Sequence, residues 1–117
     1  MTDGVRIVLY PAKDLAASKA LFTVLLGAGP SADSAYYVGW NVAGQDIGLV
    51  PDDGKLAGPT PFFKVSDIKA SVQALLDAGA TVAEDVRDVG GGRQVGSVTD
   101  KDGNRIGLLQ DSVLSGG

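Results

Sequence analysis

The sequence predicts an α+β fold made of two similar halves, each with the element order β-α-β-β-β. Three observations support this. The 117 residues, 44% of them apolar, suffice for one domain and not for two independent ones. The segments Gly44–Leu49 and Gly103–Leu108 are identical at four of six positions. In both halves a short apolar run is followed by an Asp and then by apolar residues at helical spacing.

In the first half, the β-branched run Val5–Tyr10 predicts a strand, and Asp14 is a candidate helix N-cap. The helix ends at Gly27 or Gly29, because glycine readily takes the left-handed conformation of a C-cap. The residues that we expect on its buried side are Leu15, Phe22, Leu25 and Leu26.

Two further strands complete this half, over residues 35–42 and 46–50, joined by an Ala43-Gly44 turn. The second half repeats the order with a strand over 61–65, an N-cap at Asp67 and a helix stop at Gly79. Its apolar helix stripe consists of Ile68, Val72, Leu75 and Leu76. Strands are predicted at 81–89, 94–99 and 105–110.

Composition restricts the chemistry. The chain has no Cys and no His, and Glu84 is its only Glu, so disulfides and thiol chemistry are excluded and metal ligands are scarce. A general base would have to be an Asp, Lys or Tyr. The net charge of −4 and the scattered basic residues argue against nucleic acid as a partner. Without a signal peptide or a membrane-length apolar segment, the sequence predicts a cytoplasmic protein with no membrane partner.

Several motifs, in this order and spacing, resemble those of the vicinal oxygen chelate superfamily, which includes glyoxalases, extradiol dioxygenases, fosfomycin-modifying enzymes and bleomycin-resistance proteins. They are Ile7–Tyr10, Asp14-Leu15, Phe63–Ile68, Ala78–Ala80 and the closing Asp100–Leu108. The resemblance implies one domain over 1–117, with module one at about 4–51 and module two at about 58–111. It further implies a curved mixed sheet around an open cup, helices outside, and a homodimer.

The enzymes of this superfamily hold a divalent ion in the cup with four side chains, two from each module. The resemblance places those positions at Arg6, Gly48, Thr60 and Gly107, none of which is a usual ligand for a divalent metal. We therefore expect no metal and no cofactor. The alternative is a weak site that uses Asp46 and Asp102 in a shifted register.

Strand alternation then predicts which side chains line the cup. They are Arg6, Val8, Tyr10, Asp46, Gly48, Thr60, Phe62, Lys64, Arg105 and Gly107, with Val50 and Leu109 beside them. Glycines at positions 48 and 107 would widen the floor of the cup and let a flat or bulky ligand approach the backbone.

The only aromatic cluster is Tyr36, Tyr37 and Trp40. A two-residue turn at Ala43-Gly44 would place Tyr37 in the cup and pack Trp40 under a helix. A turn one residue different in length would instead expose Trp40 and Tyr36 to the ligand. Both Tyr37 and Trp40 are therefore candidate ligand contacts, suited to planar or cationic molecules.

Two polar loops have simpler interpretations. Residues 90–93, Gly-Gly-Gly-Arg, lack the pattern of a phosphate-binding loop and predict a hairpin tip, from which Arg93 and Gln94 can touch a ligand. Asp100, Asp102 and Asn104 are typical turn-forming residues.

These features favour a protein that binds a small organic molecule, an antibiotic or other secondary metabolite, in a metal-free cup without chemistry. The acidic balance favours a cationic guest. Three alternatives stay open at this point: a glyoxalase- or dioxygenase-type enzyme with an atypical metal site, a metal-free enzyme that uses Tyr10, Lys64 or Arg6, and an accessory subunit.

Overall fold

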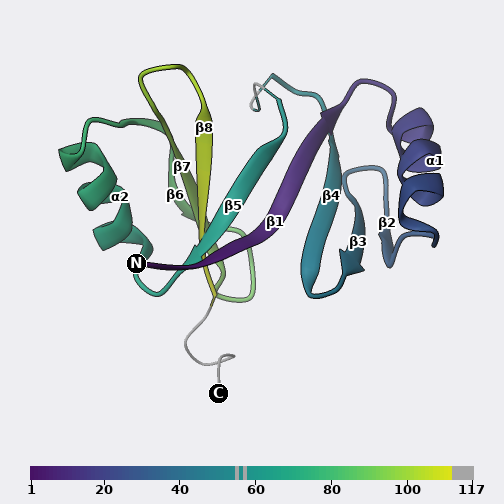
Figure 1. The fold of residues 1–117 in the computed structure, drawn as a ribbon, viewed down its shortest axis with the longest axis horizontal. Helices are drawn as coiled ribbons and strands as arrows, with labels where there is room; N and C mark the ends of the chain where they lie inside the picture. The colour runs from purple at the N-terminus through teal and green to yellow at the C-terminus, as the bar shows by residue number, and fades with distance from the viewer. Residues whose placement is uncertain (55, 57, 112–117) are drawn as a thin grey trace. The chain divides into compact units, whose positions relative to one another are not determined.

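A computed structural model describes residues 1–54, 56 and 58–111, and this part of the chain forms two helices and eight strands (Figure 1). It divides into two compact units. The first unit is Ile7–Thr60, and the second is Met1–Arg6 together with the chain from Pro61 onward. The expectation of a single domain stays a prediction, and each unit is described separately below.

The first unit confirms the predicted β-α-β-β-β order. Its elements are β1 (Thr2–Ala12) from Ile7 onward, α1 (Leu15–Leu26), β2 (Ala32–Asp33), β3 (Val38–Val42) and β4 (Gln45–Pro51). The strand order is β2-β3-β4-β1, with β1 parallel to β4 and β3 antiparallel to β4. The strand predicted over 35–42 begins later, because the Ser34 hydroxyl accepts hydrogen bonds from the N–H groups of Tyr36 and Tyr37 and holds a turn there.

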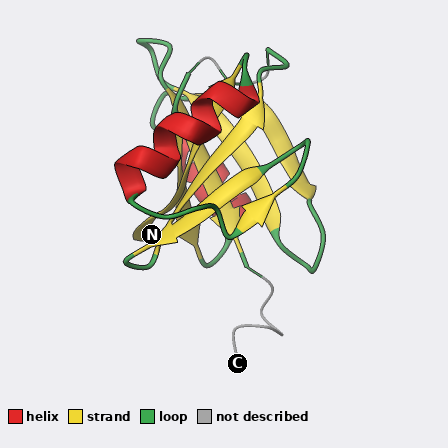
Figure 2. Ribbon diagram, turned by 90° about the vertical axis from the view of Figure 1, so that its right-hand side faces the viewer, coloured by secondary structure: helices red, strands yellow, loops and turns green. Residues whose placement is uncertain are grey.

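Helix α1 begins and ends at the predicted residues. The Asp14 carboxylate accepts a hydrogen bond from the Ala17 N–H at 3.0 Å, and Gly27 takes the left-handed conformation with φ 74°. The helix lies across one face of the sheet (Figure 2). The core of this unit consists of Val38, Trp40 and Leu49, packed against Tyr10, Leu15, Phe22 and Leu26. Leu25, predicted on the buried side, is 71% exposed.

The second unit also has the predicted order. Its elements are β5 (Thr60–Val65), α2 (Ile68–Asp77), β6 (Thr81–Asp88), β7 (Gln94–Thr99) and β8 (Arg105–Gln110). The strand order is β5-β8-β7-β6, with β5 parallel to β8 and the other pairs antiparallel. Strands β7 and β8 have the predicted bounds.

Helix α2 covers one face of this second sheet. The Asp67 carboxylate caps it by accepting from the Ala70 N–H at 3.1 Å, as predicted. A further end group, the Ile68 N–H, donates to Oε1 of Gln110 at 2.7 Å. Behind the helix lies a core of Val65, Ile68 and Leu108, packed against Phe63, Val72, Leu75 and Val86.

Both polar loops of the second unit are hairpin loops, as predicted. The Asp100 carboxylate accepts from the N–H groups of Asp102 and Asn104, each at 2.9 Å. In the other loop, Gly90, Gly91 and Gly92 all have positive φ, and the Arg93 N–H donates back to the Gly90 carbonyl. In the described ranges, neither helix is long and apolar enough to cross a membrane.

Candidate functional site

In each unit, the sheet face turned away from the helix carries the predicted glycine. In the first unit, Gly48 pairs with Leu9 on one side and with Gly39 on the other. A Cβ built on Gly48 would lie 2.6 Å from Cε1 of Tyr37 and 2.8 Å from Cδ2 of Leu9. We call this surface the Gly48 face; its side chains include Leu9, Tyr37, Asn41 and Asp46.

The β1 residues predicted on this face are wrong by one position. Ile7 and Leu9, the partners of Asp46 and Gly48, lie on the Gly48 face. Tyr10 packs instead against α1, with its ring centroid 5.0 Å from that of Phe22, and Val8 shares its side of the strand. Arg6 belongs to the second unit. The error arose because the resemblance set Arg6 inward on β1, whereas pairing with β4 puts Ile7 and Leu9 on that face.

The structure separates the three aromatic residues. The Ala43-Gly44 turn has two residues, both with positive φ, as a tight hairpin requires. Tyr37 therefore lies on the Gly48 face, Trp40 is buried at 3% exposure under α1, and Tyr36 is 81% exposed. Trp40 is thereby removed from the predicted ligand contacts on this face.

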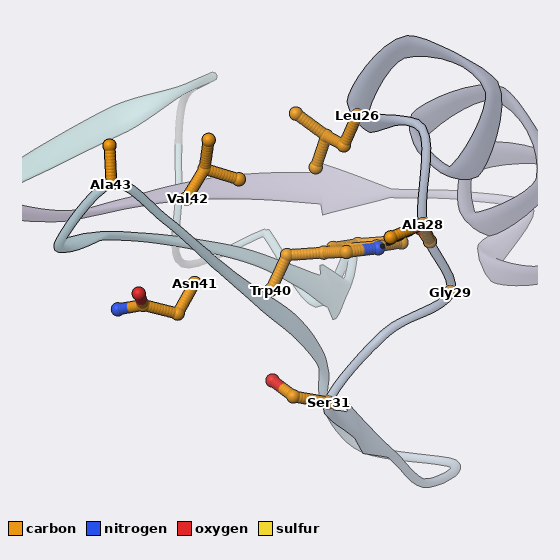
Figure 3. A pocket seen from close by; sticks show the side chains of 8 residues that line it. All are labelled: Leu26, Ala28, Gly29, Ser31, Trp40, Asn41, Val42 and Ala43. Atoms are coloured by element: carbon orange, nitrogen blue, oxygen red, sulfur yellow. Dashed lines mark hydrogen bonds between the residues drawn. The ribbon is translucent and has the colours of Figure 1, made fainter.

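The Trp40 side chain also lines a surface pocket of about 340 Å³ (Figure 3). The indole ring extends toward Ala28, with Leu26 above it, and its Nε1–H donates to the Ala28 carbonyl at 2.9 Å. Asn41, also at the rim, donates to Asp46 at 2.7 Å. No ionisable side chain lines this pocket, and its three polar side chains, Trp40, Asn41 and Ser31, each already make a hydrogen bond.

In the second unit, one row of side chains crosses the sheet face turned away from α2. Phe62 pairs with Gly107, Gly107 with Ser97, and Ser97 with Glu84. Arg105 and Leu109 flank Gly107 on β8, and Lys64 pairs with Leu109. We call this surface the Gly107 face. It brings together four predicted site residues: Phe62, Lys64, Arg105 and Gly107.

We expected Gly48 and Gly107 to leave open space for a ligand, and the structure shows that this space is filled. A Cβ on Gly107 would lie 2.6 Å from Cγ of Phe62, and the Tyr37 ring covers Gly39 and Gly48 in the same way. Real Cβ atoms do not approach other atoms so closely, so only glycine fits beneath these rings. The two glycines therefore make room for the chain's own aromatic side chains.

The charged groups of the Gly107 face form two clusters. Glu84 lies 3.8 Å from both Arg87 Nη2 and Arg105 Nη1. Asp111, just beyond β8, accepts a hydrogen bond from Arg93 Nε at 2.8 Å and lies 3.6 Å from Lys64 Nζ. Partial burial raises the pKa of Asp111, but the Arg93 hydrogen bond and the charges of Arg93, Lys64 and Arg6 outweigh it and hold that pKa below its ordinary value.

Two buried polar atoms of the second unit have no hydrogen-bond partner among the described residues. They are Oγ of Ser97 and Nε of Arg6. Ser97 is 4% exposed and lies between Gly107 and Glu84 in the row described above. Unpaired buried donors are unfavourable, so these atoms indicate where a ligand acceptor would improve the site.

The side chains present do not fit the divalent metal of the vicinal oxygen chelate enzymes. On β1, the side chain beside Asp46 on the Gly48 face is Ile7, which is apolar. The Thr60 hydroxyl donates to the Gly58 carbonyl at 3.0 Å, and Gly48 and Gly107 offer no side chain and lie under rings. Within residues 1–54, 56 and 58–111, no three His, Cys, Asp or Glu residues are grouped to hold a metal.

Sequence reasoning overlooked several groups at this site. Ser97, Glu84 and Asp111 were not predicted as site residues, and Leu9 was assigned to the other face. Counting back along β7 from the Asp100 turn would have placed Ser97 opposite Gly107. The bulges in β6 prevent the same count for Glu84, because each bulge shifts the pairing.

The chain is similar to known proteins in sequence and in fold. The model of the Glyoxalase/Bleomycin resistance protein/Dioxygenase superfamily matches residues 4–108. Among curated proteins, none is similar enough to this sequence to count as a match.

Solved structures share the fold. A glyoxalase/bleomycin resistance protein/dioxygenase superfamily member from Vibrio splendidus 12B01 has a TM-score of 0.70 at 19% identity, over 90% of this chain and 97% of that one. A variant of Streptomyces coelicolor methylmalonyl-CoA epimerase in complex with 2-nitronate-propionyl-CoA has a TM-score of 0.74 at 15% identity, over 97% of both chains. At these identities the likeness concerns the fold alone.

Proposed function

Since the chain belongs to the Glyoxalase/Bleomycin resistance protein/Dioxygenase superfamily, we propose that it binds a small organic molecule, an antibiotic or other secondary metabolite, without a metal. The Gly107 face is the proposed binding surface. This is the surface that combines an aromatic ring, an unpaired buried hydroxyl and accessible charged groups.

The observation that carries this proposal is the replacement of metal-ligand positions by glycines under aromatic rings. A carboxylate at position 107 would need the space that Phe62 fills. The centre of the face is therefore aromatic and apolar, and its charged groups lie around it. Such a combination suits an organic molecule with a planar or apolar body and a few polar groups.

The polar groups give this surface directional contacts. Ser97 Oγ has no described partner, and its hydroxyl can both donate and accept a hydrogen bond. Glu84 and Arg105 are partly accessible, with side-chain exposures of 30% and 22%. Their 3.8 Å separation exceeds a hydrogen bond, so each retains capacity to bind a polar ligand group.

A thermal-shift screen of aromatic metabolites, repeated by isothermal titration calorimetry, tests the proposal. Binding should persist in EDTA and weaken about tenfold in Ser97→Ala, which removes the unpaired hydroxyl. Val24→Ala, on the exposed side of α1, is the matched control and should bind as the wild type does. Trp40 fluorescence serves as a folding control, because Trp40 is buried under α1 in the core of the first unit.

Absence of binding by every compound, or equal affinity of the Ser97→Ala variant, would contradict the proposal. Binding that appears only after a divalent metal is added would favour the alternative, a glyoxalase- or dioxygenase-type enzyme with an atypical metal site. Measurement of the metal content of the purified protein distinguishes that case.

A further inference from the structure

The basic residues of this acidic protein are distributed unevenly. All four arginines of the chain, Arg6, Arg87, Arg93 and Arg105, belong to the second unit. Lys64 and Arg105 lie on the Gly107 face. The chain as a whole has a net charge of −4, so an excess of positive charge can exist only locally, around particular side chains.

Two of these side chains, Lys64 and Arg93, contact a single carboxylate. Arg93 Nε donates to Asp111 Oδ1 at 2.8 Å, and Lys64 Nζ lies 3.6 Å from Asp111 Oδ2. Arg6 is close enough for its charge to act on the same carboxylate. We call Arg6, Lys64 and Arg93 the basic cluster. With Asp111 included, the group keeps two uncompensated positive charges.

Hydrogen-bond donors of the basic cluster remain available. The 3.6 Å separation between Lys64 and Asp111 exceeds a hydrogen bond, so the ammonium group can accept another partner. Nε of Arg6 also has no acceptor in the described part of the chain, but this atom is buried, so Lys64 and Arg93 are the groups that a ligand contacts. The bond between Arg93 and Asp111 shows that the cluster already holds one oxyanion at normal distance.

A ligand can reach the cluster. The side chains of Lys64 and Arg93 are 37% and 36% exposed. Lys64 follows Phe62 by two residues on β5 and so lies on the same side of the sheet. Because salt screens charges beyond about 8 Å, acidic residues farther away than that do not cancel this local field.

We propose that the basic cluster binds an oxyanion, the carboxylate or phosphate group of the small molecule whose planar or apolar body lies toward Phe62. This inference rests on the proposed function and deepens it by naming the ligand class. It reverses the sequence expectation of a cationic guest, which came from net charge alone and not from the location of the charges.

The first experiment uses inorganic phosphate alone at constant ionic strength, titrated by ¹⁵N–¹H NMR. Wild-type protein should show saturable shifts at Lys64, Arg93 and their neighbours. Lys64→Gln and Arg93→Gln should each weaken binding about tenfold, the effect of one charge-assisted hydrogen bond. Lys69→Gln is the matched control, because it removes the same charge from the exposed side of α2.

A fourth variant tests whether the Arg93–Asp111 pair marks a site for phosphate or serves stability alone. Asp111→Asn removes the carboxylate that already occupies the cluster, so phosphate should bind several-fold more tightly. If the Arg93–Asp111 pair served stability only, Asp111→Asn would not increase the affinity. Absence of saturable shifts, or equal affinity in all five proteins, would overturn the inference.

Paired compounds distinguish carboxylate from phosphate and separate this inference from the proposed function. Benzoate is compared with benzamide, and phenyl phosphate with phenol, by calorimetry. Tighter binding of either anion than of its neutral partner, lost in Lys64→Gln, supports the inference and identifies the oxyanion. Equal binding of anion and neutral partner overturns the inference but leaves the proposed function standing. If inorganic phosphate binds but no aromatic compound does, the inference about the oxyanion stands and the proposed function is contradicted.

Discussion

Gly107 and Phe62 form a contact that one added carbon atom would disrupt. A Cβ on Gly107 would lie 2.6 Å from Cγ of Phe62, whose side chain is only 8% exposed and has little room to move. We expect Gly107→Ala to lower the free energy of unfolding by about 1–3 kcal/mol, the usual cost of overpacking. Urea denaturation followed by circular dichroism measures this loss.

Gly29→Ala is the control for this variant, because a Cβ at Gly29 meets no atom within 4 Å. Its stability should stay within about 0.5 kcal/mol of the wild type. In the double variant Gly107→Ala/Phe62→Leu, the cost should be smaller than the sum of the single changes. Additive losses would mean that the ring and the glycine do not restrict each other.

Asp111 gives the stability of the protein a defined dependence on acid pH. Its folded-state pKa lies below the ordinary value of 3.8, so the ionised carboxylate stabilises the folded state above that pH. The stabilisation is lost as the pH falls from 3.8 through the lower folded pKa. We expect Asp111→Asn to show a shallower loss of stability below pH 4, measured by urea denaturation across pH. Identical profiles would contradict this assignment.

At the scale of the element, the two helices begin in the same way and differ in how their ends are satisfied. Asp14 and Asp67 both cap the third following N–H, as their position before an apolar stripe predicts. Among the described residues, only α2 receives a cap from outside its own segment, from Gln110 to the Ile68 N–H. That contact joins residues 42 apart in the sequence, and no local pattern indicates it.

Removal of the α2 cap tests the local contribution. We expect Asp67→Ala to reduce the free energy of unfolding by about 1 kcal/mol, because the Ala70 N–H loses its acceptor. Asp67→Ser keeps a capping oxygen and should retain most of the stability. Thermal unfolding of the three proteins at one pH measures the difference, and equal losses in Ala and Ser variants would show that the cap does not matter.

For the whole molecule, the prediction is independence from divalent metals. Extended dialysis against EDTA should leave the melting temperature unchanged, and added Zn²⁺, Ni²⁺ or Mn²⁺ should produce no saturable increase. The reason is the donor set: a buried Ile7, a Thr60 hydroxyl bonded to Gly58, and glycines beneath rings. A stabilising metal would show that other oxygen ligands of the chain form a site.

Assembly is a second property of the whole molecule. The homodimer expected from the family resemblance stays a prediction, which sedimentation velocity at several protein concentrations tests. The result also bears on ligand titrations, because their stoichiometry is counted per chain.

The local chemistry of the chain was sufficient to predict its elements. Caps, glycine stops, strand alternation and the repeat at Gly48 and Gly107 depend on interactions within a few residues, so they are visible in the sequence. The bounds of β7 and β8 followed from the residue pattern, and the position of Tyr37 followed from a turn of known length. The sequence also showed glycines at the positions of the metal ligands, but not that aromatic rings fill the space above them.

Three-dimensional packing decided what those glycines do and where charge gathers. Phe62 covers Gly107 because β5 pairs with β8 across more than forty residues of sequence, and Asp111 meets Lys64 and Arg93 for the same kind of reason. On β1, alternation alone left two possible faces, and only pairing with β4 placed Leu9 beside Gly48. Register and long-range pairing are cooperative properties of the folded chain, so the sequence did not show which charges come together. Net charge alone therefore predicted a cationic guest, although the Gly107 face carries arginine and lysine side chains.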